Sequence, residues 1–240
     1  MWNYCLSQAR SILLHRPLLI MDVNGVLLHS INEPSNPRYK APHYSIRVNR
    51  KIIIPRRSIH KFFEFCFFNY DVAIWSCLQK KNLFPILEGV LSEMEMKSLV
   101  FIFHQEQALD LGYQKNSNKP IFLKPLSLVT ERYPKYREEN ILIIDDSPYK
   151  CALNPFYSSL HPSPYTGDQS ENFLFEDLIP LLRYIHDQRE SVHARLMKIY
   201  PNWSLRMVKE SRKVHKDIWE LLSSKNLVHV SHSLEEMKNN

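Results

Sequence analysis

The chain has 240 residues and a formal net charge of +6, with 44% hydrophobic and 23% charged residues. This composition is typical of a soluble folded domain and excludes a disordered chain, and the mild charge does not indicate a nucleic-acid-binding surface. The longest apolar runs, such as residues 141–144, fall short of the roughly 18 residues that a transmembrane helix needs. None of the four glycines belongs to a glycine-rich nucleotide-binding loop.

The predicted elements alternate between strands and helices along most of the chain. The first half is predicted to contain a strand at 17–21, a loop at 31–43, a hairpin of 44–48 and 52–54 that turns at 49–51, and a helix at 58–68. A strand at 71–75, a helix at 79–96 and a strand at 99–103 are expected to follow. The remaining predicted elements are a strand at 140–144, a loop at 154–170 and a helix at 175–185. This alternation predicts an α/β fold with a mostly parallel, open sheet that helices cover on both faces.

Beyond residue 187 the sequence becomes basic and mainly helical in pattern. Apolar residues and one histidine follow a single helical face there, at Leu205, Val208, His215, Ile218, Trp219 and Leu222. We interpret this segment as a helical tail that packs on the domain or is loosely solvated, with a basic amphipathic helix for a partner as the alternative. The predicted division is an N-terminal extension at 1–16, a domain at 17–187 and a tail at 188–240.

The four cysteines, Cys5, Cys66, Cys77 and Cys151, form no C-x-x-C pair and no zinc-binding pattern. Cys66 and Cys77 lie among apolar residues, so we expect buried free thiols and a reducing compartment. Residues 1–16 contain arginine and no acidic residue, a pattern that weakly resembles a mitochondrial presequence. We therefore expect a nuclear or cytoplasmic protein, with the mitochondrion as the alternative.

Polar side chains follow the predicted strands at their carboxyl ends, where open α/β sheets bind their ligands. Asp22 follows the first strand, Ser76 the second, and Asp145 and Asp146 the fourth, while Lys124 follows a short apolar run. Carboxylates that converge repel one another unless a cation lies between them, and oxygen ligands favour Mg²⁺. Three carboxylates, a hydroxyl and an ammonium in this order suit phosphoryl transfer.

These segments resemble the four motifs of the haloacid dehalogenase (HAD) superfamily. Their surroundings resemble its branch that contains the phosphatases of the RNA polymerase II C-terminal domain and their small, NLI-interacting-factor-like relatives. Residues 18–30 (LLIMDVNGVLLHS) are similar to the first motif, D-x-D-x-T, and residues 54–63 to an R-P-G segment. Residues 71–78 resemble a V-V-W-T-A strand and residues 143–148 an I-V-D-D/N-S-P motif. Residues 147–164 look closest to a plant group of this branch whose activity is uncertain.

The resemblance covers roughly residues 17–187 and implies a HAD-like three-layer sandwich with a small hairpin insertion and no large cap. It implies that Asp22 is a nucleophile that forms an aspartyl-phosphate, that Ser76 binds a phosphoryl oxygen and that Lys124 neutralises negative charge. It further implies Mg²⁺ held by Asp22, the main-chain carbonyl of Asn24, and Asp145 or Asp146.

A site without a large cap suits a phosphoprotein or peptide substrate rather than a small metabolite. The hairpin is expected to form the rim of that site and to offer positive charge to a phosphopeptide. The residues expected to carry this charge are Arg47, Arg50, Lys51, Arg56 and Arg57.

Two positions depart from the family pattern: Asn24 replaces the general acid/base aspartate, and Val26 replaces the threonine. An amide cannot shuttle a proton, and loss of such a group costs about 10²–10⁴-fold in rate. Three hypotheses follow. The first is a Mg²⁺-dependent phosphatase of phosphoserine or phosphothreonine proteins that is slow or uses another proton donor. The others are a catalytically silent phosphate-binding module and a receptor similar to the presequence receptor of the mitochondrial inner-membrane translocase. That receptor class carries a membrane helix, which this sequence does not contain.

Overall fold

The computed structural model describes residues 16–34, 41–113, 120–155, 157–186 and 190–199. A parallel sheet of five strands lies at the centre of these residues, in the order β10-β9-β1-β5-β6. Its strands are β1 (Leu18–Met21), β5 (Asp71–Trp75), β6 (Leu99–Phe103), β9 (Ile141–Ile144) and β10 (Ser159–Leu160). The predicted α/β class with a mostly parallel sheet is therefore confirmed.

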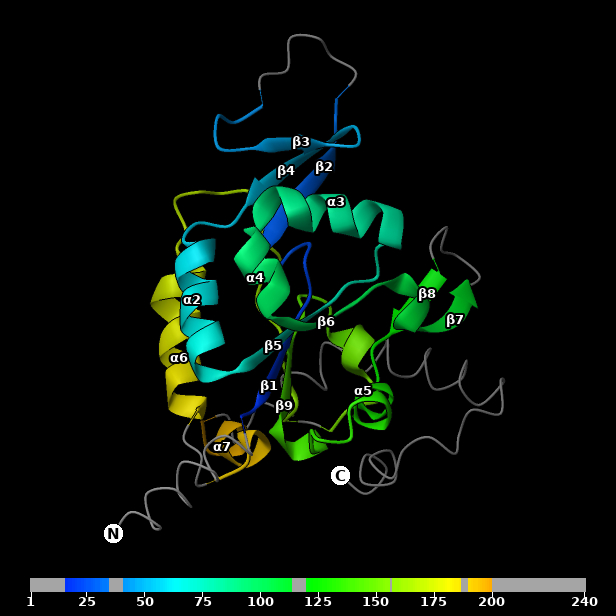
Figure 1. Ribbon diagram of the computed structural model, residues 1–240, viewed down its shortest axis with the longest axis vertical. Coiled ribbons are helices and arrows are strands. Elements are labelled where there is room, and N and C mark those ends of the chain that lie inside the picture. The colour runs from blue at the N-terminus through cyan, green and yellow to red at the C-terminus, as the bar shows by residue number, and fades with distance from the viewer. Residues whose placement is uncertain (1–15, 35–40, 114–119, 156, 187–189, 200–240) are drawn as a thin grey trace.

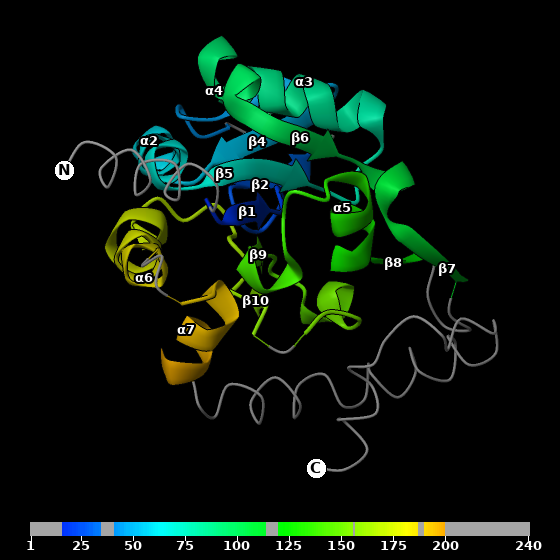
Figure 2. The ribbon, with the colours of Figure 1, turned by 60° about the horizontal axis from the view of Figure 1, so that its bottom comes forward.

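Helices cover both faces of this sheet, because successive residues of a strand point to opposite sides. Leu19 and Met21 of β1 pack in a core with α2 (Ile59–Asn69), α3 (Lys80–Val90), α6 (Ile179–Ile185) and α7 (Val192–Ile199). Leu18 and Ile20 pack in a second core with α5 (Leu126–Arg132) on the other face. Figure 2 shows α2 and α6 on one side of the sheet and α5 on the other.

A small antiparallel sheet lies beyond the end of the central sheet (Figure 1). It has the order β2-β4-β3, with β2 (Leu28–Asn32), β3 (Ile46–Val48) and β4 (Lys51–Pro55). The predicted hairpin is present as β3 and β4, and Asn49 and Arg50 form its turn with φ angles of 47° and 60°. Positive φ at both central residues is the geometry of a tight two-residue hairpin. Strand β2 was not predicted and falls partly within the expected loop at 31–43.

The predicted helix at 79–96 is divided in two. Helix α3 ends at Val90 and α4 (Glu93–Ser98) begins after Ser92. The Ser92 hydroxyl accepts the Glu95 N–H at 3.2 Å, and the Glu95 carboxylate accepts the Ser92 N–H at 2.7 Å. This reciprocal capping box starts a new helix, so the chain changes direction where helical periodicity alone predicts continuity.

Several short elements were not predicted from the sequence. These are the hairpin of β7 (Leu109–Tyr113) and β8 (Pro120–Leu123), helix α5, strand β10 inside the expected loop at 154–170, and the 3₁₀ turns η1 (Gln105–Gln107), η2 (Glu138–Asn140) and η3 (Pro148–Cys151). The predicted helix at 175–185 consists of a π-helical turn, η4 (Leu174–Leu178), followed by α6.

Helix α7 lies within the predicted tail and packs against the domain. Val192 and Leu196 are buried in the main core, and the His193 ring nitrogen Nε2 lies 3.1 Å from the Ile141 carbonyl oxygen. The apolar helical face predicted from Leu205 to Leu222 lies outside the described residues, as do residues 1–15. Across the described ranges, no helix combines the length and the apolar character that crossing a membrane requires.

Candidate active site

The carboxyl ends of β1, β5 and β9 stop at the same edge of the sheet. The β-ladder pairs Met21 with both Ile74 and Ile144, so the residues that follow these strands emerge side by side. The Asp22 N–H donates to the Ile144 carbonyl at 2.8 Å, and the Ser76 N–H donates to that of Phe103 at 3.0 Å. The parallel register therefore brings the predicted polar residues to one place.

Asp22, Asp145 and Asp146 form a carboxylate cluster at this edge. One oxygen from each side chain lies within 4.8 Å of the others. Asp22 and Asp145 are buried, and the Asp146 side chain is 14% exposed. Three converging oxygen donors of this kind fit a divalent metal ion, which would also offset their mutual repulsion.

Gly25 allows the loop after Asp22 to approach Asp146 closely. Its φ angle is +85°, and a Cβ atom at this position would lie 2.1 Å from Asp146 Oδ2. Any other residue would therefore both strain the backbone and displace that carboxylate. Val26, at the position of the family's threonine, is fully buried in the core.

Lys124 lies beneath the cluster and is completely buried. Its ammonium contacts Asp22 Oδ1 at 3.2 Å and Asp145 Oδ2 at 2.5 Å, and it donates to the Trp75 carbonyl at 2.6 Å. The contacts with Asp145 and Trp75 are hydrogen bonds, and the contact with Asp22 is an ion pair. The unpredicted hairpin delivers this lysine, because β8 ends at Leu123, directly before it.

Lys150 is a second buried cation that the sequence analysis did not single out. Its ammonium lies 2.8 Å from Asp22 Oδ2, 3.0 Å from Asp145 Oδ1 and 3.9 Å from Asp146 Oδ1. It belongs to η3, and its carbonyl accepts the Lys124 N–H at 2.7 Å, which ties the two lysine backbones together. The available signal was a lysine four residues after Asp146, a spacing that brings side chains together in a helical turn.

The pKa values of these groups follow from burial and charge. Burial by itself would raise the pKa of Asp22, but Lys124 and Lys150 lower it to about 2. Burial raises the pKa of Asp146 to about 6, and the neighbouring Asp145 and Asp22 add to this while Lys150 opposes it. Burial would lower the pKa of both lysines, but the carboxylates around them raise it. Asp22 and both ammonium groups are therefore charged at neutral pH.

Ser76 and Cys77 follow β5 at the same edge. Ser76 is buried, and its hydroxyl accepts the Leu78 N–H at 3.3 Å. Burial raises the pKa of Cys77 to about 11, so this thiol is protonated at neutral pH. Cys66, Cys77 and Cys151 are free thiols; Cys66 and Cys151 are buried, whereas Cys77 is half-buried rather than buried as predicted.

Asn24 is exposed and holds the start of the small sheet. Its side-chain oxygen accepts the N–H of Ser30, the middle residue of β2, at 2.8 Å, which fixes the amide next to that strand. The residue at the family's acid/base position therefore has a structural partner in this chain.

Arg56 does not belong to the basic rim that we predicted for the hairpin. It is 2% exposed, its guanidinium lies 2.7 Å from the Glu171 carboxylate, and the rings of Tyr165 and Phe173 lie 4.8 Å away. Burial between two aromatic rings makes it a brace between the small sheet and residues 165–173. The other four predicted rim residues, Arg47, Arg50, Lys51 and Arg57, are exposed or half-buried.

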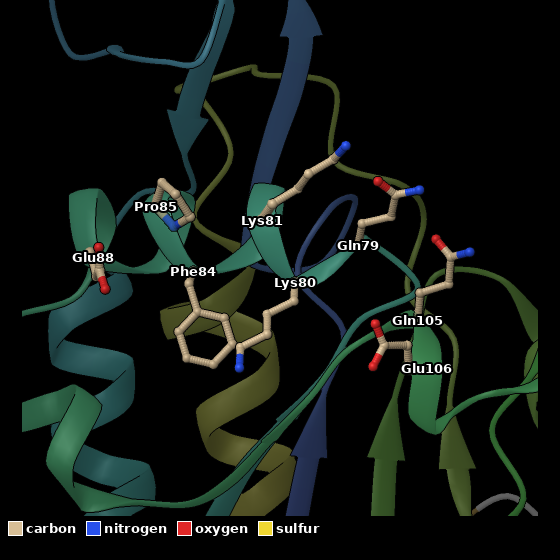
Figure 3. Close-up of a pocket in the computed structure, with 8 residues that line it drawn as sticks. All are labelled: Gln79, Lys80, Lys81, Phe84, Pro85, Glu88, Gln105 and Glu106. Carbon is tan, nitrogen blue, oxygen red and sulfur yellow. The ribbon is translucent and has the colours of Figure 1, made fainter.

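A hollow of about 710 Å³ lies between the first turns of α3 and η1, which follow the carboxyl ends of β5 and β6 (Figure 3). Two amides, two lysines, two acids and two apolar residues line it: Gln79, Lys80, Lys81, Phe84, Pro85, Glu88, Gln105 and Glu106. The Lys80 ammonium lies 5.6 Å from the centre of the Phe84 ring. The chain enters this hollow three residues after Ser76.

Comparison with known proteins identifies relatives of this chain. It is 24% identical over 180 residues to an uncharacterised FCP1 homology domain-containing protein of Schizosaccharomyces pombe, which covers 71% of this chain and 70% of that protein. Among solved structures, it is similar to a fission yeast RNA polymerase II CTD phosphatase Fcp1 variant bound to beryllium fluoride, with a TM-score of 0.47 and 15% identity over 89% of this chain. Only 59% of the length of that solved chain is covered.

A second solved structure, of Fcp1 described as an essential RNA polymerase II CTD phosphatase, gives a TM-score of 0.47 and 13% identity over 92% of this chain and 69% of that chain. The model of the NLI interacting factor-like phosphatase family matches residues 17–193. Because that match includes both the central sheet and the carboxylate cluster at its edge, the chain belongs to the NLI interacting factor-like phosphatase family.

Proposed function

We propose that this chain is a Mg²⁺-dependent phosphatase that acts on phosphoserine or phosphothreonine in proteins and peptides. The observation that carries the proposal is the environment of Asp22, a buried carboxylate between two ammonium groups at the edge of the sheet. Its pKa of about 2 keeps it ionised and able to act as a nucleophile at neutral pH. The fully buried Lys124 ammonium beside it offsets its repulsion of an incoming phosphate.

In the proposed reaction, an oxygen of Asp22 attacks phosphorus, and the bond between phosphorus and the serine oxygen breaks. The products are an aspartyl-phosphate and an alkoxide, which takes its proton from solvent because Asn24 has none to give. Water then attacks the phosphorus, its proton passes to solvent, and the Asp22 carboxylate and inorganic phosphate are released. Lys124 neutralises charge on the phosphoryl group in both steps, and Ser76 hydrogen-bonds one of its oxygens.

Asp22, the main-chain carbonyl of Asn24, and Asp145 or Asp146 are the groups that would hold Mg²⁺, because all are hard oxygen donors. When bound, the ion offsets the repulsion between phosphate and the carboxylates. Without a positioned acid/base, the rate falls by about 10²–10⁴-fold, so the proposed activity is weak.

The hollow at the segments that follow β5 and β6 supports a peptide substrate. Its amides can pair with a peptide backbone, Phe84 and Pro85 offer apolar surface, and Lys80 and Lys81 offer positive charge. Arg50 in the turn between β3 and β4 and Arg57 after β4 are exposed and offer further positive charge to a phosphopeptide.

A second candidate function is a silent module that binds phosphorylated peptides without hydrolysing them. The contact between Asn24 and the Ser30 N–H favours it, because this contact gives the amide a role that needs no proton transfer. The resemblance of residues 147–164 to a plant group of uncertain activity supports the same reading. The translocase-receptor alternative stays a prediction without a supporting contact in the described part of the chain.

The test compares the native chain with Asp22→Asn on an aryl phosphate and on a phosphoserine peptide, with Mg²⁺ and with EDTA. We expect slow turnover by the native chain with Mg²⁺, a phosphorylated intermediate that can be trapped by acid quench, and neither in Asp22→Asn. Equal rates for the two proteins would reject the phosphatase. Calorimetric binding of the same peptide without turnover would then support the binding module.

A further inference from the structure

We infer that the ammonium of Lys150 takes the place of the divalent cation among Asp22, Asp145 and Asp146 in the metal-free protein, and that Mg²⁺ has to displace it in order to bind. This inference rests on the metal site of the proposed function. It makes Lys150 an internal competitor that sets how tightly the chain holds its metal ion.

The contacts of Lys150 are those expected of a cation at the centre of the cluster. Its ammonium lies 2.8, 3.0 and 3.9 Å from one oxygen of each of the three carboxylates. Those three residues are also the ones whose oxygens lie within 4.8 Å of one another. A single positive charge therefore already touches every side chain that could hold the metal ion.

Lys124 does not occupy that position, although it contacts two of the same carboxylates. The Lys124 ammonium contacts Asp22 Oδ1 and Asp145 Oδ2. The Lys150 ammonium contacts the other oxygen of each carboxylate, Asp22 Oδ2 and Asp145 Oδ1. The third partner of Lys124 is the Trp75 carbonyl rather than Asp146. The two lysines thus hold opposite sides of the carboxylates, and only Lys150 faces all three.

The position of Lys150 allows its ammonium to leave without a change in the fold. Its backbone is held by two hydrogen bonds, from its N–H to the Ser147 carbonyl at 3.1 Å and from the Lys124 N–H to its own carbonyl at 2.7 Å. Its side chain is 11% exposed, whereas that of Lys124 is fully buried. A lysine carries its charge on a flexible four-carbon stem, so the ammonium can move to solvent while η3 stays in place.

Charge balance gives the direction of the effect. The formal charges of the three carboxylates and two ammonium groups sum to −1, and removal of Lys150 changes this sum to −2. A more negative cluster with no internal cation to displace attracts a divalent ion more strongly. Replacing Lys150 by an uncharged residue is therefore expected to tighten Mg²⁺ binding, by about tenfold or more.

The experiment is calorimetric titration of Mg²⁺ into the metal-free full chain and its Lys150→Met variant. The matched control is Lys97→Met, which removes the same charge from an exposed lysine. Lys97 lies on α4, directly before the amino end of β6, whereas the carboxylate cluster lies at the carboxyl ends of the strands. We expect a Kd about tenfold or more lower for Lys150→Met and within about twofold of native for Lys97→Met, because distant exposed charges are screened. Lys150→Gln, with a polar side chain, repeats the test if the methionine variant does not fold.

Thermal unfolding gives a second readout that does not depend on activity. In EDTA, Lys150→Met is expected to have a lower Tm than the native chain, because three carboxylates then share one ammonium, and Mg²⁺ is expected to raise its Tm by more than it raises that of the native chain. An equal or weaker Mg²⁺ affinity in Lys150→Met would overturn the inference, as would no binding by either protein. Tighter binding by the variant with no phosphatase activity in the native chain would reject the proposed function and support the inference.

Discussion

Asn24 is the residue that, in the proposed reaction, stands where a general acid/base aspartate would be needed. Its side-chain oxygen accepts the Ser30 N–H at 2.8 Å, and an aspartate oxygen can accept the same hydrogen bond. The second carboxylate oxygen of an aspartate would then be available to carry a proton. The replacement thus restores the missing group without removing the contact that holds β2.

Asn24→Asp is expected to raise turnover by up to about 10²–10⁴-fold, with the larger gain on phosphoserine peptides. An aryl leaving group needs little protonation, so an aryl phosphate depends less on the restored acid. Steady-state rates on both substrates measure the effect, and the Asp22→Asn, Asn24→Asp double variant is the control that lacks the nucleophile. No gain on either substrate would show that proton transfer is not what limits the native chain.

Asp146 gives the metal-free protein a pH dependence whose sign follows from its raised pKa. Its pKa is about 6 in the folded state against 3.8 ordinarily, so between these values the folded chain binds more protons than the unfolded chain. Because of this group, the free energy of unfolding falls as pH rises from about 4 to about 6. Above pH 6 its contribution remains at this lower value. Asp22, with a pKa of about 2, acts in the opposite direction and only below about pH 4.

We expect Asp146→Asn to gain stability relative to the native chain as the pH of an EDTA buffer rises from about 5 to about 7.5. Asp145, Asp22, Lys150, Ser147 and Arg56 all interact with Asp146, and all are unchanged in this comparison. Urea unfolding at the two pH values measures it, with Glu64→Gln on the exposed side of α2 as the control. If the difference in free energy of unfolding between Asp146→Asn and the native chain were the same at both pH values, a raised Asp146 pKa would be contradicted.

At the scale of elements, the short segments position the site. Hairpin β7–β8 places Lys124, and the turn η3 places Lys150. Asn154, which follows η3, joins this part of the chain to the segment after β8: it accepts the Leu126 N–H at 2.8 Å and donates to the Lys124 carbonyl at 2.9 Å. These elements depend on contacts with distant parts of the chain, so their own residues show little periodicity. Helix α7 differs, because it completes the core rather than the site.

Leu196→Ala is expected to lower the free energy of unfolding by about 2–5 kcal/mol, because it leaves a cavity where α7 packs in the main core. Met197 is the matched control, since it is the next residue and is 50% exposed. Chemical denaturation of Leu196→Ala and Met197→Ala checks the comparison. Equal stability of the two variants would mean that α7 does not contribute to the core, and a chain ending near Gln188 would then keep its full stability.

For the whole molecule, the carboxylate cluster links metal binding to stability, because the cluster is assembled from β1 and β9 only in the folded state. Mg²⁺ at about one hundred times its Kd is expected to stabilise the fold by about 2.7 kcal/mol. The Asp145→Asn, Asp146→Asn double variant is expected to lose this gain. In EDTA it is expected to be less stable than the native chain, because the buried ammonium groups of Lys124 and Lys150 then share the Asp22 carboxylate alone. Thermal unfolding without any Mg²⁺ effect at millimolar concentration would reject the metal site.

The sequence by itself determined the central sheet and most of the candidate site at its carboxyl edge. The strands of a sheet covered on both faces are continuous apolar runs, so LLIM, VAIW and ILII are visible without any partner. A polar residue directly after such a run is forced to the carboxyl edge, which is why Asp22, Ser76 and Asp145 could be placed there from the sequence. Strand-end position is a local property, and local properties can be read from a sequence.

Only the tertiary structure decided where the cations lie. Arg56 has the composition of a rim residue, yet it is enclosed by Tyr165, Phe173 and Glu171, more than one hundred positions away. Lys150 looks like one lysine among many, yet the fold directs it into a cluster that includes Asp22, 128 positions away. A long charged side chain has no preferred direction of its own, so its role depends on which distant carboxylate or aromatic ring the packing brings within reach.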